Sequence, residues 1–267
     1  MASIGSSDLE PSLGIGRILS QSFSILFRRF VLFFAISFVV QLAVLIIVRL
    51  IVPTPDIASP ADLSAFSSIG TFVGILLGLV ATSVTTGIIV VAAYDAWLGN
   101  PSRPGAYIGA ALAAIVPLVV LSIVTNIGFV LGFMLVILPG LYLAAMWSCV
   151  TPAIVAEGMG FASLGRSAEL TRNYRWSIIG LLIVVGLIVI GISLVLQAAV
   201  GSLMGVNALV PGPEQMAVAT SLPYQLLNAA VGALTAAFMA IVTAVLFARL
   251  KEIKEGVGYE DLGSVFD

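Results

Sequence analysis

The sequence predicts an all-α membrane protein: a polytopic bundle of about six transmembrane helices, with two further amphipathic helices at the membrane surface. Hydrophobic residues make up 60% of the 267-residue chain and charged residues only 9%, against roughly 25% charged residues in soluble domains. Long stretches without any charged residue recur along the chain. So few charges cannot cover so much apolar surface in water, and hydrocarbon must therefore surround most of the chain.

Four uncharged stretches, and the apolar run after Arg29, locate the transmembrane helices. One helix needs about 20 residues to cross a hydrocarbon core roughly 30 Å thick. The longest stretch, 104–156, would measure about 80 Å as one helix, so it must fold back on itself. We place its hairpin at 129–132, beside Gly128 and Gly132. The expected spans are 30–52, 69–96, 106–128, 131–156, 177–205 and 219–248.

Three prolines fall inside the third and fourth spans: Pro117, Pro139 and Pro152. Proline has no N–H to donate, and its ring clashes with the carbonyl four residues earlier. We therefore expect each proline to kink its helix. Membrane bundles tolerate such kinks where neighbouring groups satisfy the freed carbonyls.

Two segments have the pattern of helices that lie on a membrane rather than across it. Residues 12–29 carry apolar side chains at helical spacing, and residues 161–172 repeat the pattern with Leu164, Ala168 and Leu170. We expect a single membrane domain, 1–267. Its parts are a cytoplasmic tail with an amphipathic helix (1–29), spans one to four (30–156), a cytoplasmic amphipathic segment (157–176), spans five and six (177–248) and a cytoplasmic tail (249–267).

The basic residues predict the orientation. Of the eleven Lys and Arg residues, all except Arg49 fall on one side of the predicted bundle. Basic residues mark the cytoplasmic side of a membrane protein. We therefore expect a multi-pass protein of the bacterial cytoplasmic (inner) membrane, with both termini in the cytoplasm.

Small residues at every fourth position predict where helices pack. Lipid offers no hydrophobic drive for helix association, so close backbone approach must supply the contact. The spacing favours packing within one chain over a dimer interface, and the oligomeric state stays open. The predicted packing residues are Gly70, Gly74 and Gly78 in the second span, and Gly232, Ala236 and Ala240 in the sixth.

The residue inventory removes several classes of function. The chain has no histidine and a single cysteine, Cys149, which excludes disulfide frameworks, zinc sites and Cys/His chemistry. A net charge of −2 argues against nucleic-acid binding, which needs a basic patch. We expect no catalytic residues, no metal and no cofactor, and membrane lipids, among them anionic ones, as partners.

The centres of the predicted spans hold polar but no ionisable side chains, which weakens the case for an ion-coupled transporter. Hydrogen bonds between helices explain such polar groups adequately, and a pathway for a polar lipid or solute is the alternative. The polar residues are Gln41, Ser83, Thr85, Thr86, Asn126, Ser148, Thr151, Gln197 and Asn228.

The densest charged cluster precedes the fifth span. Its arginines lie beside two aromatic residues and suit anionic lipid headgroups, because guanidinium binds phosphate with two hydrogen bonds. The alternative is plain charge that sets the topology. The headgroup candidates are Arg166, Arg172, Arg175, Tyr174 and Trp176. Nearer the second span, we expect Asp95 and Arg103 to form an ion pair at the interface.

The stretch around the fourth span resembles a known family. It carries Leu138-Pro139-Gly140, Trp147, Pro152, Glu157-Gly158 and Gly165-Arg166-Ser167-Ala168-Glu169-Leu170-Thr171-Arg172. These motifs are similar to the bacterial glycerophosphoryl diester phosphodiesterase membrane-domain family, in which a helix broken at Pro-Gly leads to a glutamate and an RS-x-x-L-T helix. The resemblance implies the membrane module without its hydrolase, since that soluble domain uses histidine and this chain has none.

The first functional hypothesis is a non-enzymatic inner-membrane protein, a lipid-interacting scaffold or accessory subunit. The alternative is a transporter or channel for a lipid or small solute, which broken helices and polar groups would serve. A membrane-embedded lipid enzyme is the weakest hypothesis, because only Asp95 and Glu157 are candidate acid–base groups. A continuous polar cavity would favour transport, and a packed bundle with a basic inner groove would favour lipid binding.

Overall fold

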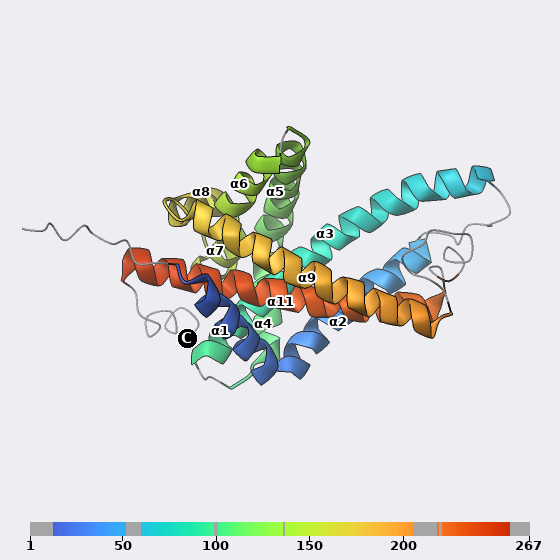
Figure 1. Ribbon diagram of the computed structural model, residues 1–267, viewed down its shortest axis with the longest axis horizontal. Coiled ribbons are helices and arrows are strands. Elements are labelled where there is room, and N and C mark those ends of the chain that lie inside the picture. Colours follow the sequence, from blue (N-terminus) through green and yellow to red (C-terminus); the bar gives the residue numbers. More distant parts are fainter. Residues whose placement is uncertain are drawn as a thin grey trace, which may run out of the picture.

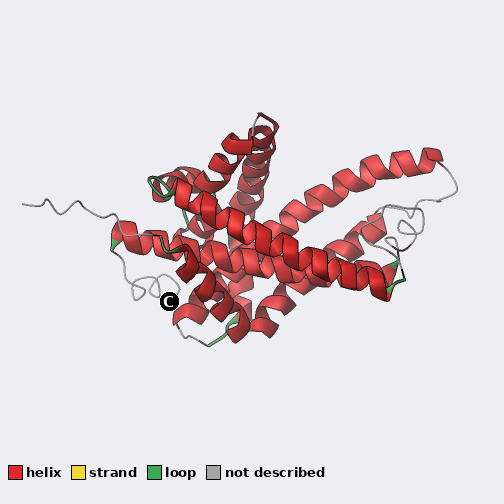
Figure 2. Cartoon of the chain, in the orientation of Figure 1, coloured by secondary structure: helices red, strands yellow, loops and turns green. Residues whose placement is uncertain are grey.

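A computed structural model describes residues 13–51, 60–98, 101–135, 137–205, 218 and 221–256, without the side chains of 60–71 and 97–98. This described chain is helical and contains no strand (Figure 2). The helices are α1 (Ile15–Arg28), α2 (Phe30–Ile51), α3 (Pro60–Leu98), α4 (Pro104–Ala113), α5 (Ile115–Leu135), α6 (Ile137–Met146), α7 (Val150–Glu157), the 3-10 turn η1 (Gly160–Ala162), α8 (Ser163–Leu170), α9 (Arg175–Leu203) and α11 (Leu222–Glu255).

Six segments of the described chain are long and apolar enough to cross a membrane. They confirm the predicted helical bundle, and the chain is a multi-pass membrane protein. Long helices α9 and α11 run side by side, while the α5–α6 hairpin projects across their direction (Figure 1). The spans are Phe30–Ile51, Phe72–Ala96, Ile115–Leu135, Ile137–Glu157, Arg175–Leu203 and Leu222–Glu255. Of the predicted terminal parts 1–29 and 249–267, residues 1–12 and 257–267 lie outside the described residues, and α11 extends into the second part as far as Glu255.

The turn between the third and fourth spans corrects the predicted hairpin at 129–132. Helix α5 continues to Leu135 and α6 begins at Ile137. Gly128 and Gly132 lie inside α5, where they face the returning chain: a Cβ on Gly132 would lie only 2.9 Å from the Cα of Gly140. These glycines serve close helix approach rather than a turn.

Two of the three prolines break their helices as predicted. Helix α4 gives way to α5 at Ala114, shortly before Pro117, and α6 ends at Met146, shortly before Pro152. The kink expected at Pro139 is wrong. Pro139 lies in the first turn of α6, where the backbone N–H groups have no helical partner in any case.

Small-residue packing occurs in the sixth span but not where it was predicted in the second. Ala240 is buried where α11 packs against α2 and α3, and Gly232 and Ala236 are half-buried. By contrast, no described atom lies within 4 Å of a Cβ placed on Gly74 or Gly78. The predicted glycine face of α3 therefore points away from its neighbours, and the surroundings of Gly70 lie outside the description.

Helix α1 is amphipathic, as predicted, and it docks on the bundle. Its side chains Ile18, Ser22 and Leu26 are buried. The Phe23 ring packs 4.8 Å from the Phe238 ring of α11, measured between centroids. The segment before the first span is thus held by helix packing as well as by any membrane surface.

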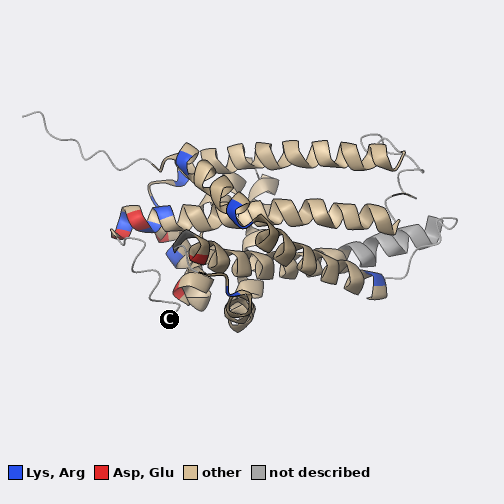
Figure 3. Ribbon diagram, turned by 90° about the horizontal axis from the view of Figure 1, so that it is seen from below, with Lys and Arg blue, Asp and Glu red and all other residues tan. Residues whose placement is uncertain are grey.

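Charged side chains gather toward one end of the long helices, with a long uncharged stretch beside them (Figure 3). The C-terminal end of α11 lies at this charged end, close to α8 (Figure 1). Arg49 is in the last turn of α2, and its Nε donates a 2.9 Å hydrogen bond to Oε1 of Gln225. The charges are therefore at the ends of the spans rather than inside them.

Replacing Gly132 by Ala should lower the thermal stability of the purified protein in detergent. The new methyl group would meet the Gly140 backbone at 2.9 Å, which can be relieved only by separating α5 from α6. Gly78→Ala is the matched control, because nothing described lies within 4 Å of that position. Equal melting temperatures for the two variants would contradict the packing of this hairpin.

Candidate functional site

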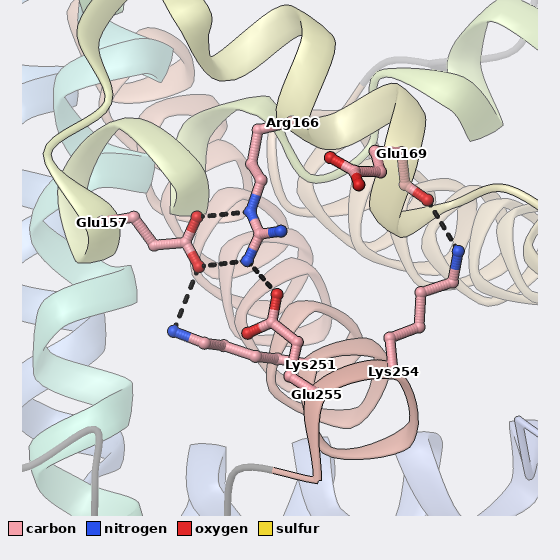
Figure 4. A network of polar contacts seen from close by, with 6 residues as sticks. All are labelled: Glu157, Arg166, Glu169, Lys251, Lys254 and Glu255. Atoms are coloured by element: carbon pink, nitrogen blue, oxygen red, sulfur yellow. Dashed lines mark hydrogen bonds and ion pairs between the residues drawn. The ribbon is translucent and has the colours of Figure 1, made fainter.

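The charged end is organised around Arg166 of α8 (Figure 4). Its guanidinium forms two hydrogen bonds with Glu157, from Nε to Oε2 at 2.8 Å and from Nη2 to Oε1 at 2.9 Å. The same Nη2 bonds Glu255 of α11, and Lys251 Nζ lies 3.1 Å from Glu157 Oε1. These contacts join α7, α8 and α11, and the hydrogen bonds that Arg166 donates to Glu157 raise the pKa of the guanidinium.

The network corrects the role predicted for Arg166, whose guanidinium is satisfied by two carboxylates rather than open to a lipid phosphate. Arg175 is also engaged: its guanidinium lies 4.8 Å from the centre of the Tyr142 ring and donates to the Ala168 carbonyl at 3.2 Å. Tyr174 is buried. Arg172 is exposed, as is Trp176 at 73%, and for these two a headgroup contact stays a prediction.

The predicted pair of Asp95 and Arg103 does not form. Asp95 is buried in the last turn of α3, where it lies close to the Tyr107 side chain of α4. The side chain of Arg103 is exposed, and it is the backbone N–H of Arg103 that donates to the Tyr107 hydroxyl, at 2.9 Å. Tyr107, rather than the side chain of Arg103, is therefore the neighbour of Asp95.

A buried hydroxyl holds the break between α6 and α7. The Ser167 hydroxyl donates to the Met146 carbonyl at 2.8 Å and accepts the Cys149 N–H at 3.1 Å. Thr171 Oγ1 lies 3.3 Å from the same Met146 carbonyl. Ser167, Thr171 and Cys149 are fully buried, so no solvent could replace these bonds. We call Ser167 and Thr171 the α8 latch.

The α8 latch gives a physical meaning to the motif quoted for the family resemblance. Arg166 joins α7 to α11. Ser167 and Thr171 contact the Met146 carbonyl, which the break leaves without a helical partner. Leu170 is buried in the core, at 1% exposure. Two basic side chains cap the C-terminal carbonyls of α8: Lys254 donates to Glu169 at 2.7 Å, and Arg175 donates to Ala168.

A cleft of about 440 Å³ lies on the other side of this break, between α3, α5, α7 and α11. Its apolar wall includes the Trp147 indole, and none of its lining residues is ionisable. Thr82 and Met239 at its rim are exposed, so the cleft opens to the side of the bundle. Its polar lining residues are Thr82, Ser83, Thr86, Ser122, Thr125, Asn126, Ser148, Thr151 and Thr243.

Comparison with family models, with curated proteins and with solved structures found no match to this chain. The resemblance to the phosphodiesterase membrane domain therefore stays a prediction. Function has to be argued from the chemistry of the site. In the part of the chain that the structure describes, no group of three or more His, Cys, Asp or Glu side chains could hold a metal ion.

Several of the polar residues singled out from the sequence meet in this cleft. Ser83, Thr86, Asn126, Ser148 and Thr151 line it together. Gln41 and Asn228 instead line a separate cavity between α2 and α11, while Thr85 and Gln197 line neither.

Four cleft residues were missed: Thr82, Ser122, Thr125 and Thr243. Their helical spacing was the available signal, since Ser122 and Thr125 are one turn apart on α5 and both face α3 and α7. In the sequence, hydroxyl residues at helical spacing are explained by hydrogen bonds within their own helix. Only the fold shows that the hydroxyl-bearing faces of four helices meet at one cleft. The cleft can hold an uncharged polar group by hydrogen bonds, and its lining supplies no acid or base.

Replacing Ser167 by Ala should destabilise the protein by about 1–3 kcal/mol, the cost of leaving a buried backbone group without a partner. The Cys149 N–H would lose its bond, and the Met146 carbonyl would keep only the longer contact with Thr171. Ser202→Ala is the control, because that exposed hydroxyl bonds only its own helix, at Ala198. Denaturant unfolding in detergent measures both variants, and a Ser167 variant as stable as the control would contradict the latch.

Proposed function

We propose that this chain is a non-enzymatic membrane protein that binds lipid in the cleft between α3, α5, α7 and α11, as a lipid-interacting scaffold or accessory subunit. The observation that carries the proposal is a polar lining, without ionisable groups, in a cavity that opens to the side of a membrane bundle. A lipid enters from the side, whereas a water-soluble substrate needs a path from one end.

Cleft size and lining support this proposal. About 440 Å³ is within the range of small-molecule sites, which combine an apolar wall with a few polar groups. Leu118, Ile154 and Leu182 supply apolar wall beside the hydroxyls. The polar head of a lipid would lie among the hydroxyls, while its chains remain in the surrounding hydrocarbon.

A transporter or channel for a lipid or small solute is the second candidate, and it would use the same cleft. Breaks next to Ala114 and at residues 147–149 favour it, because interrupted helices are common at transporter binding sites. A continuous polar cavity was the sign expected for transport, whereas this polar cleft opens at the side of the bundle. We therefore place the lipid-binding role first, and the charged network that joins α7, α8 and α11 at one end supports this order.

For localisation, we propose the bacterial inner membrane with the charged end in the cytoplasm. The support is the one-sided distribution of Lys and Arg. Arg166, Lys251 and Lys254 lie at the charged end of the bundle. Arg49 is the exception, because it lies in the last turn of α2, at the other end of the bundle.

Thr82→Trp should reduce the lipid that copurifies with the protein, because an indole at the rim would fill the cleft. Ile75→Trp is the matched control: it lies two turns earlier on α3, is exposed, and does not line the cleft. Native mass spectrometry of both variants in mild detergent counts the bound lipids. Equal lipid retention by the two variants would remove the cleft as the binding site.

A fusion of alkaline phosphatase after Asp267 should be inactive in bacterial cells, because this enzyme works only after export and we place the C-terminus in the cytoplasm. The same enzyme inserted within 206–218, which connects the predicted fifth and sixth spans on the side opposite the basic residues, should be active. Reversed activities would overturn the orientation, and full recovery of the untagged chain from the soluble fraction would overturn the membrane localisation.

A further inference from the structure

Of the nine polar side chains that line the cleft, all except Thr86 and Thr151 already donate a hydrogen bond within the bundle. Thr82 donates to Gly78 at 2.8 Å, Ser122 donates to Leu118 at 2.6 Å and Thr243 donates to Met239 at 2.9 Å. Each of these acceptors is a backbone carbonyl of the hydroxyl's own helix. A hydroxyl has one proton and two lone pairs, so its oxygen remains able to accept a hydrogen bond from a ligand.

Other polar groups of the cleft behave in the same way. Ser148 donates to the Ala145 carbonyl at 2.9 Å. One N–H of the Asn126 amide donates to the Ser122 carbonyl at 2.8 Å, which leaves the amide oxygen as an acceptor and the second N–H as a donor. On α3, the Ser83 hydroxyl lies within hydrogen-bond distance of both the Leu79 carbonyl and the Ser122 hydroxyl, and its single proton serves one of them at a time. The polar lining therefore presents mainly acceptors, contributed by α3, α5, the α6–α7 break and α11.

An acceptor-rich lining selects among lipid headgroups. Phosphate oxygens are acceptors themselves and would meet lone pairs, and no Lys or Arg lines the cleft to pair with their charge. A charged group taken into such a site loses its hydration without gaining a partner. Alcohol groups, in contrast, bring protons that these oxygens can accept, and they carry no charge.

Resting on the proposed lipid-binding function, we propose that the cleft binds an uncharged hydroxyl-bearing group, as presented by a diacylglycerol or a glycosyl diacylglycerol, in preference to a phosphate headgroup. The exposed rim at Thr82 and Met239 gives a lipid's chains a way out, and the apolar wall that includes Trp147 covers the carbon skeleton of the headgroup.

The test uses the purified full chain in detergent and native mass spectrometry, with three lipids that share dioleoyl chains: dioleoylglycerol, its monoglucoside and dioleoyl phosphatidic acid. The glucoside and dioleoylglycerol should be retained about tenfold more strongly than phosphatidic acid, as the loss of one or two hydrogen bonds predicts. Free glycerol and methyl glucoside form a further arm, and neither should displace the bound lipid.

Thr243→Val should weaken retention of the glucoside about fivefold, the effect of losing one neutral hydrogen bond. Thr235→Val is the matched control, two turns earlier on α11, with a hydroxyl that also bonds its own helix and does not line the cleft. Because both hydroxyls serve only their own helix, both variants should fold, and melting temperatures check this.

The outcomes separate the two proposals. Equal or stronger retention of phosphatidic acid, or equal losses in the two threonine variants, would overturn the headgroup inference and leave lipid binding intact. Displacement by free methyl glucoside would overturn the lipid as the source of the hydroxyls in favour of a solute. If Thr82→Trp retained all three lipids as well as the unmodified chain does, the proposed function itself would fall.

Discussion

A helix that breaks inside a membrane must find partners for its freed backbone groups, because hydrocarbon offers none. The rest of this structure depends on how the chain meets that requirement at residues 147–149. Pro152 removes one N–H, the helix ends at Met146, and the Ser167 hydroxyl satisfies a carbonyl and an N–H across the gap. One serine on the short helix α8, which lies outside the membrane spans, thereby fixes the direction in which α7 leaves the break.

The charged network positions the α8 latch rather than serving as a site of its own. Arg166 is one residue before Ser167, so its bonds to Glu157 and Glu255 hold α8 against the ends of α7 and α11. The participating side chains remain partly exposed, with 18% exposure at Arg166. Partly exposed ion pairs contribute modestly to stability, and their value here lies in the geometry that they impose on the neighbouring hydroxyls.

Length and hydropathy predicted the six spans, because the thickness of a bilayer sets a minimum number of apolar residues. The failures concern residues whose role depends on what lies across from them. Gly128 and Gly132 suit a turn or a close helix contact equally, and only the positions of Trp147 opposite Gly128 and of Gly140 opposite Gly132 decide. Arg166 suits a phosphate or a carboxylate, and one of its partners, Glu255, is 89 positions away. The cleft could not be predicted for the same reason, because the sequence does not show which helices lie opposite each other. Each hydroxyl can bond a carbonyl of its own helix, so its sequence position gives no sign of a shared site.

The α8 latch and the cleft are opposite faces of the same three-residue break. Ser148 lines the cleft, while the N–H of the next residue, Cys149, is held by Ser167. A site whose wall is fixed before the ligand arrives loses less entropy on binding than one that must be ordered by the ligand. The buried bonds of the latch therefore do more than repair a broken helix: they hold Trp147 and Ser148 in place at the cleft wall. The hydrogen bonds of Ser167 therefore have two effects. They supply partners for backbone groups freed near Pro152, and they fix one wall of the polar cleft before a ligand binds.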